Sequence, residues 1–260
     1  MQDSEKATIM NNHQQHVLIT GASGSIGQAI TRAFATNGAR VALQYHRGQA
    51  AAEQLLAELP GEGHLLLSAD IAVPADVEHM INSVVQAWGR LDVLVNNAAI
   101  YLEHAVADVS FEQWHTTFER VIAVNLLGAA NAAYCAARHM MNQGGGRIIN
   151  VGSRGGYRGE PRMTSYGASK AALHALSQSL AQELGPYNIY VTAVAPGFVN
   201  GGMGTDALSG PQGDAIRAQS PLGRVAEPEE VAHVVAFLAA PGSEFLTGAV
   251  VDINGASYLR

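Results

Sequence analysis

A tyrosine and a lysine stand four residues apart in the segment YGASK, and a serine lies thirteen residues before the tyrosine. On a helix, Tyr166 and Lys170 share one face and lie one turn apart. A free tyrosine has a pKa of about 10, which is too high for efficient proton transfer at neutral pH, and a nearby ammonium group lowers it. Together with the hydroxyl of Ser153, which can hold a substrate carbonyl, the pair predicts a site of proton transfer.

The same spacing has an ordinary interpretation, because most Tyr-x-x-x-Lys pairs are surface residues of a helix. The position of Ser153 favours the interpretation as a proton-transfer site. This serine follows the apolar run RIINVG, which is typical of a buried strand. Ligands of open α/β sheets bind at the carboxyl ends of the strands, so Ser153 is expected at a binding edge.

A glycine-rich turn, GASGSIG, occupies residues 21–27 between a predicted strand, HVLIT, and a predicted helix. Glycines allow a tight turn and let backbone N–H groups approach a pyrophosphate, and the helix N-terminus adds partial positive charge. A plain strand–helix turn is the alternative interpretation. The acidic Asp70 further along the chain favours a dinucleotide site.

The residues after the second predicted strand indicate which dinucleotide binds. NAD-binding folds usually carry Asp or Glu there, to bond the ribose 2′-hydroxyl. Here the sequence is QYHRG, with no acid before Glu53. A carboxylate would repel a 2′-phosphate, whereas Arg47 can bind one through charge-assisted hydrogen bonds. We therefore expect NADP(H), unless Arg47 is only a solvated loop charge.

These residues must be positioned by a succession of strands and helices. Apolar, β-rich runs predict strands at 16–20, 40–45, 64–70, 91–99, 147–153, 189–197 and 249–255. Amphipathic segments between them predict helices at 25–37, 49–59, 74–88, 111–142, 164–184 and 227–239. Strands joined by helices imply right-handed crossovers and a parallel sheet covered on both faces. The predicted fold is a single α/β domain of the Rossmann type, doubly wound, with seven parallel strands.

Composition limits the partners and the compartment. The 260 residues are 48% hydrophobic and 14% charged, with a formal net charge of −7, which argues against nucleic acid. The single cysteine, Cys135, cannot form an internal disulfide, and this fits a reducing compartment. The ten histidines show no metal-ligand spacing, and no apolar run approaches the ~20 residues of a membrane span. We expect a cytoplasmic protein without a metal, membrane or nucleic-acid partner.

Two segments differ from the rest of the chain. Residues 1–15 are polar and predict a disordered N-terminal arm, so that the domain covers 16–260. Residues 198–222 are rich in glycine and small polar residues and have weak periodicity. A long irregular stretch inside a compact domain is often a functional lid, so this segment is predicted to cover the substrate.

Over nearly its whole length, about 14–258, the sequence resembles the short-chain dehydrogenase/reductase family. The matching pieces have the family's order and spacing: TGASGSIG (20–27), Asp70, NNAA (96–99), Asn125 in VNLLG, Ser153, YGASK (166–170), PG (196–197) and TGAVVDING (247–255). The resemblance implies the Rossmann-type fold and an oxidoreductase that interconverts a carbonyl and a secondary alcohol.

The resemblance also implies roles for the matched residues. Tyr166 would give its proton to the carbonyl oxygen, Lys170 would lower the tyrosine pKa and bond the nicotinamide ribose, and Ser153 would orient the carbonyl. Asn125 would hold a water that links Lys170 to a proton relay, and Asp70 would contact the adenine. The cofactor-binding residues would be Gly21, Ser23, Ser25, Ile26, Gly27, Tyr45, His46, Arg47, Asp70, Ile71, Asn97, Ala98, Ala99, Tyr166, Lys170, Pro196, Gly197 and Val199.

Three positions depart from the family's pattern. Ser25 stands where the glycine turn usually has a glycine, and Ala99 replaces the glycine of NNAG. Gly201 stands where the family often has a threonine that bonds the nicotinamide carboxamide. That bond would then come from Asn200 or Thr205, or the nicotinamide would be held more loosely.

The expected activity is therefore NADP(H)-dependent reduction of a small-molecule carbonyl, or the reverse oxidation. A 3-oxoacyl thioester is the first substrate expected by resemblance, and sugars, steroids, quinones and pteridine-like compounds stay open. The alternative is a non-enzymatic NADP(H)-binding redox sensor, which would be expected to lose the tyrosine or the lysine. Family members commonly form tetramers, so a homotetramer built on the helices 111–142 and 164–184 is expected.

Overall fold

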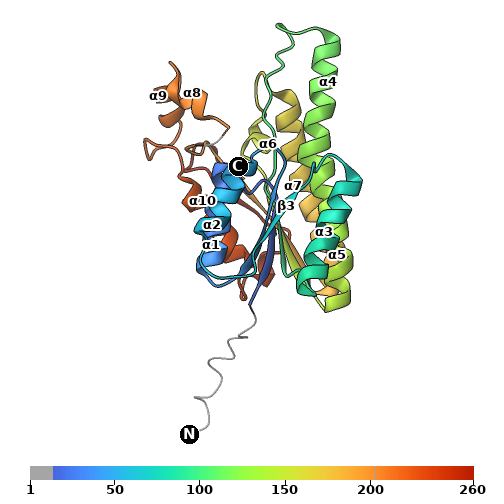
Figure 1. The fold of residues 1–260 in the computed structure, drawn as a ribbon. Helices are drawn as coiled ribbons and strands as arrows, with labels where there is room; N and C mark the ends of the chain where they lie inside the picture. The colour runs from blue at the N-terminus through green and yellow to red at the C-terminus, as the bar shows by residue number, and fades with distance from the viewer. Residues whose placement is uncertain (1–13, 202) are drawn as a thin grey trace.

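The computed structural model describes residues 14–201 and 203–260 (Figure 1). The predicted disordered arm therefore lies, for its first thirteen residues, outside the described part of the chain. Seven strands form one sheet with every neighbouring pair parallel, in the order β3-β2-β1-β4-β5-β6-β7. They are β1 (His16–Ile19), β2 (Arg40–Tyr45), β3 (Leu65–Ser68), β4 (Val93–Asn96), β5 (Gly146–Val151), β6 (Ile189–Pro196) and β7 (Val250–Ile253). The predicted fold class is confirmed.

Helices connect the strands and cover both faces of the sheet (Figure 1). The longer ones are α1 (Ser25–Thr36), α2 (Gln49–Glu58), α3 (Pro74–Trp88), α4 (Phe111–Ile122), α5 (Ala129–Gln143), α7 (Thr164–Leu184) and α10 (Pro228–Ala239). The short ones are α6 (Gly155–Arg158), α8 (Thr205–Ser209) and α9 (Gly213–Arg217), with 3-10 turns η2 (Gly185–Tyr187) and η3 (Glu244–Leu246). The sequence did not predict the short helices, because each is too brief to show a helical period.

The period of two along each strand divides the core into two halves. In β1, Val17 and Ile19 pack with buried residues of α1, α2 and α10, whereas Leu18 packs with residues of α3, α5 and α7. Both sets are fully buried. A strand that is apolar on both sides is what a parallel sheet with helices on both faces requires.

The binding edge is set by the strand order. β1 lies between β2 and β4, so the connections run outward in opposite directions from this point of the sheet. The crevice at the carboxyl ends of such strands is the usual ligand site of open α/β sheets. The turn after β1 fits closely there: Gly21 has a φ of +65°, and a Cβ on it would lie 2.8 Å from the Cα of Ala98 after β4. Only glycine accommodates both the conformation and the contact.

The long helix expected at 111–142 is interrupted. Ser110 and Gln113 form a capping box that starts α4, and a π-helical segment η1 (Ala123–Gly128) separates α4 from α5. Single π turns inside α-helices are frequent at functional sites. This one holds Asn125, one of the residues expected to act in catalysis.

The combined helix Phe111–Gln143 is long and apolar enough to cross a membrane, judged by length and composition alone. Half of its most apolar stretch is buried within the fold. Ala132, Ala133, Ala136 and Met140 of α5 pack in the same core cluster as α3. Core packing accounts for these apolar residues, and the absence of a membrane partner stays a prediction.

Candidate active site

Tyr166 lies in the first turn of α7, with its side chain beside Ser153 at the end of β5. Burial raises the pKa of Tyr166 well above its usual range, and a hydrogen bond with the Ser153 side chain acts in the opposite direction. The ring of Tyr101 meets the Tyr166 ring edge-on, with centroids 4.7 Å apart. The phenol is therefore held protonated between a hydroxyl and an aromatic wall.

Lys170 is 2% exposed, one turn after Tyr166 on the same helix face. Its Nζ donates a hydrogen bond of 2.7 Å to the backbone oxygen of Val151, the last residue of β5, and lies 5.7 Å from the centre of the Tyr166 ring. Burial lowers the pKa of this ammonium group to about 8. The lysine is thus brought to the tyrosine as expected, while its effect on the tyrosine pKa stays a prediction.

Asn125 is buried in the π-helical segment and bonds to the loop after β4. Its Oδ1 accepts from the N–H of Ile100 at 2.8 Å, and its Nδ2 donates to the oxygen of Ile100 at 3.0 Å and to Ser169 Oγ at 3.2 Å. Ser169 precedes Lys170, so Asn125 connects the loop after β4 to the helix that carries the tyrosine and lysine.

A groove of about 610 Å³ runs along the carboxyl ends of β1, β2 and β4, a volume suited to a small-molecule ligand. We call it the cofactor groove. No side chain caps the N-terminus of α1, so its first backbone N–H groups face the groove without a helical partner. These free donors and the helix dipole fit the pyrophosphate of a dinucleotide. The expected residues that line the groove are Gly21, Ser23, Ser25, Ile26, Gly27, His46, Arg47, Asp70, Ile71, Asn97, Ala98 and Ala99.

A smaller cavity of about 110 Å³, the active-site cavity, adjoins the groove and shares Ile26, Asn97, Ala99 and Met203 with it. Six further expected residues line this cavity: Ser153, Tyr166, Lys170, Pro196, Gly197 and Val199. The expected catalytic residue Asn125 lines neither space. Of the residues expected to contact the cofactor, Tyr45 lines neither space. It is the last residue of β2, and its position in the strand does not turn it toward the groove.

The far end of the groove carries charges that the sequence reasoning did not bring together. Partial burial raises the pKa of Asp70, but hydrogen bonds from the Ala72 N–H and from Arg120 outweigh this, so the pKa lies below its usual value. Arg120 Nη2 is 3.3 Å and His46 Nε2 is 3.8 Å from the carboxylate. Arg120 was missed because it comes from α4, fifty residues later, and nothing in its local sequence points to Asp70.

Neither Asn200 nor Thr205 lines the cofactor groove or the active-site cavity, and their part in binding the nicotinamide carboxamide stays a prediction. Asn200 is engaged elsewhere, since its Nδ2 lies 3.2 Å from Glu227 and its Oδ1 accepts from the N–H of Gly201. Thr205 begins α8 and is exposed. Gly201 and Met203, rather than Asn200 or Thr205, line the cofactor groove.

Two further residues of the active-site cavity were also missed: Tyr101 and Glu160. Burial and the charge of Glu160 raise the pKa of Tyr101 to about 12. Neither residue belongs to a motif, and each reaches the cavity through a loop. The signal that finds them is their proximity to Tyr166 in space, not in sequence.

Known proteins similar to this chain are oxidoreductases. A family model described as enoyl-(acyl carrier protein) reductase matches residues 21–256. The 3-oxoacyl-(acyl-carrier-protein) reductase FabG of Staphylococcus aureus is 37% identical over 93% of this chain and 97% of its own length, and that of Vibrio cholerae is 34% identical over 96% and 100%. Among solved structures, NAD+-bound xylitol dehydrogenase superposes with a TM-score of 0.85 at 30% identity, covering 93% of this chain and 98% of its own.

Proposed function

The chain belongs to the short-chain dehydrogenase/reductase family of oxidoreductases, and from that premise we propose that it reduces a carbonyl compound to a secondary alcohol with NADPH. The proposed site is made of Asn125, Ser153, Tyr166 and Lys170. The observation that carries the proposal is the half-buried phenol of Tyr166, in hydrogen-bond contact with Ser153 and one turn from a buried lysine. When bound, the nicotinamide supplies the hydride.

The protein's own residues supply position and the proton. Ser153 donates a hydrogen bond to the carbonyl oxygen, and Tyr166 transfers its proton to that oxygen as negative charge develops. Lys170 stabilises the phenolate that remains, because its ammonium nitrogen lies 5.7 Å from the centre of the Tyr166 ring. Asn125 fixes the loop and the helix on which these groups stand.

The preference for NADP(H) is supported by the charge at the end of β2. His46 and Arg47 line the cofactor groove there, and both are exposed to an incoming phosphate. Asp70, a carboxylate that lines the groove, is paired with Arg120. That pairing offsets its repulsion of a 2′-phosphate, so the net charge of this corner is positive.

For the substrate, the relatives make a 3-oxoacyl compound the first candidate, because FabG is named for that group. A non-enzymatic redox sensor is not favoured, since the tyrosine, the lysine and the serine are all present and placed together. By analogy with the family, we also propose that the protein forms a homotetramer and acts in the cytoplasm.

The test is oxidation of NADPH and of NADH over a panel of carbonyl compounds, with Tyr166→Phe alongside. We expect turnover with NADPH that falls by about a hundredfold to ten-thousandfold in the variant, since a general acid typically contributes 10² to 10⁴ in rate. NADPH binding, measured by fluorescence titration, should be unchanged because the ring is kept. Turnover that survives in Tyr166→Phe removes the tyrosine from the acid role.

A further inference from the structure

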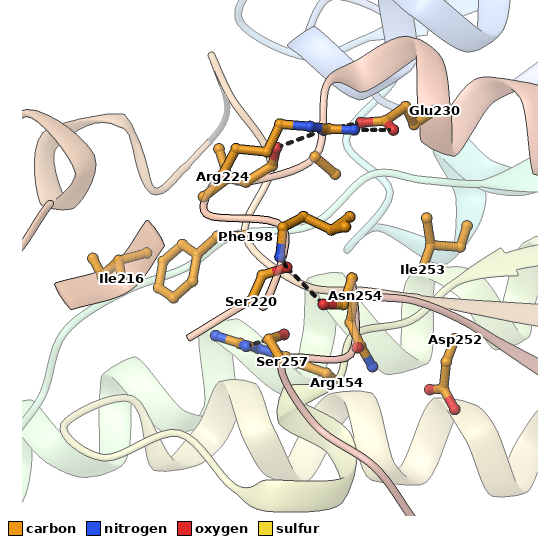
Figure 2. A pocket seen from close by; sticks show the side chains of 14 residues that line it. Arg154, Phe198, Ile216, Ser220, Arg224, Glu230, Asp252, Ile253, Asn254 and Ser257 are labelled. Carbon is orange, nitrogen blue, oxygen red and sulfur yellow. Dashed lines mark hydrogen bonds and ion pairs between the residues drawn. The ribbon is translucent and has the colours of Figure 1, made fainter. Parts of the chain in front are cut away.

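Arg154 directly follows Ser153 and is 2% exposed, which is unusual for an arginine. It lines two spaces at once: the active-site cavity, and a neighbouring cavity of about 140 Å³ that also touches Ile216 of the lid segment. Figure 2 shows this second cavity, with Arg154 next to Ser257 and beneath the ring of Phe198. Phe198 lines both spaces as well, so these two side chains form the partition between them.

The contacts of the Arg154 guanidinium are all neutral. Nη1 donates to the hydroxyl of Ser257, and Nη2 donates to Gln219 Oε1 at 2.6 Å. Its Cζ lies 5.2 Å from the centre of the Phe198 ring. Burial lowers the pKa of Arg154 and the nearby charge of Arg158 adds to the effect, while the charge of Glu160 acts in the opposite direction. The guanidinium is nevertheless a cation at any physiological pH.

The carboxylates around the two cavities are already neutralised. In the described part of the chain, each carboxylate that lines either cavity lies within ion-pair distance of an arginine other than Arg154, and Arg154 itself has no carboxylate at that distance. The pairs are Glu160 with Arg158 at 3.4 Å, Asp252 with Arg260 at 2.9 Å and Glu230 with Arg224 at 2.6 Å. Arg154 therefore carries the excess positive charge of this wall.

A buried charge with no carboxylate at ion-pair distance costs free energy that hydrogen bonds to a hydroxyl and an amide do not recover in full. A purely structural link between Ser257 and Gln219 would need donors but no charge. A planar guanidinium with free donors beside a reaction site matches a carboxylate instead.

We propose that Arg154 binds a carboxylate of the substrate, so that the carbonyl compound is an oxo acid whose acid group lies a few bonds from the reacting carbon. The inference rests on the proposed function and narrows its substrate class, from 3-oxoacyl compounds in general to the free 3-oxo acid. Reduction of the probe acetoacetate takes a hydride from NADPH at C3 and a proton from Tyr166 at the oxygen, and gives 3-hydroxybutyrate and NADP+.

The first experiment compares acetoacetate with its methyl ester, which has the same chain but no charge. We expect kcat/KM of the wild type to favour acetoacetate by about 10- to 150-fold, the ratio that a hydrogen bond to a charged group supports. Arg154→Gln should remove most of that preference. Arg224→Gln is the matched control, since it removes a cavity-lining arginine that has its own carboxylate, and it should leave the ratio unchanged.

The second experiment needs no turnover. Butyrate and butyramide are titrated calorimetrically into the wild type and Arg154→Gln, with thermal unfolding to confirm that the variant is folded. Butyrate should bind the wild type at least about tenfold more tightly than butyramide, by the same reasoning, and this difference should vanish in the variant. If the variant does not fold, the two wild-type titrations still decide.

Two results overturn the inference: equal affinity of the wild type for butyrate and butyramide, or an Arg154→Gln variant that lowers kcat/KM for acid and ester alike. The second result would make Arg154 a structural link between β5, the lid and the C-terminus. By contrast, if none of the carbonyl compounds supports NADPH oxidation by the wild type, the proposed function is contradicted. The butyrate titration would then still report on Arg154.

Discussion

At the scale of single residues, burial acts in opposite directions on the two central groups. It raises the pKa of Tyr166 and lowers that of Lys170 to about 8. Both changes have one cause, the loss of solvation of the charged form. At neutral pH the tyrosine therefore holds its proton, which is the state that a general acid for carbonyl reduction needs.

Cofactor preference is a second property of single residues. Replacing Arg47 with Ala removes a cation that lines the groove without touching the reacting end. We expect the Kd for NADPH to rise about tenfold or more, and the Kd for NADH to stay the same, because a charge-assisted contact to phosphate contributes about 1.5–3 kcal/mol. Fluorescence titration of both cofactors measures this.

Arg32→Ala is the control for Arg47, because Arg32 is an exposed arginine of α1 that pairs with Glu58 instead. Its removal should leave both cofactor affinities unchanged. Equal weakening of NADPH and NADH by Arg47→Ala would show that Arg47 does not read the 2′-phosphate.

His174, next to Ser153, should make the stability of the fold depend on pH. It is 4% exposed, and its Nε2 accepts a hydrogen bond of 3.5 Å from the Ser153 N–H. Burial and the charge of Lys170 lower its pKa to about 4. Between pH 6.5 and about 4 the unfolded chain therefore binds a proton at this position that the folded chain does not.

The free energy of unfolding should accordingly fall as the pH drops from about 6.5 to about 4, by up to about 3 kcal/mol from this residue. His174→Gln keeps a polar side chain without the titration. Urea unfolding of both proteins at pH 7.5, 6, 5 and 4 gives the difference. Parallel curves for the wild type and the variant would mean that His174 titrates normally in the fold.

At the scale of elements, the sequence predicts the features that depend on residues near one another in the chain. The buried strands and amphipathic helices were found within a few residues, because burial imposes a period of two or 3.6 on the chain. The π turn at Asn125 could not be found this way, since it depends on the bonds of one amide to Ile100 in another segment. The pair of Asp70 with Arg120, and the place of Glu160 in the cavity, are likewise properties of the folded chain.

The π turn makes a prediction about stability. Asn125→Ala leaves the backbone N–H and C=O of the half-buried Ile100 without their partner. We expect the free energy of unfolding to fall by about 2–4 kcal/mol, since a buried group left unsatisfied costs about 1–3 kcal/mol. Chemical denaturation measures the loss.

The matched change is Asn82→Ala on α3, because the Asn82 side chain is exposed and accepts one bond from His139. That variant should lose about 0.5 kcal/mol or less, as surface substitutions do. If Asn125→Ala unfolds at the same denaturant concentration as Asn82→Ala, the bonds at Ile100 do not hold the loop in place.

At the scale of the whole molecule, apolar side chains stand on the surface of the long helix that carries Asn125. Leu127 is 52% and Tyr134 is 68% exposed, one at the π turn and the other in α5. They lie on the side of the helix that faces away from the core. Exposed aromatic and aliphatic side chains on one helix face are the usual centre of a subunit interface. This is the face on which we expect the homotetramer to be built.

The double variant Leu127→Glu/Tyr134→Glu places two charges in that face and should reduce the molecular mass in solution from four protomers to fewer, since unpaired charges at an interface core are strongly unfavourable. Light scattering after gel filtration measures the mass. Phe245 of η3, which is fully exposed, offers a competing contact site. If Phe245→Glu dissociates the protein while the double variant keeps the parent mass, the assembly does not use the long helix. Loss of mass in both variants would mean that two faces meet in the tetramer, as a closed assembly with two kinds of contact requires.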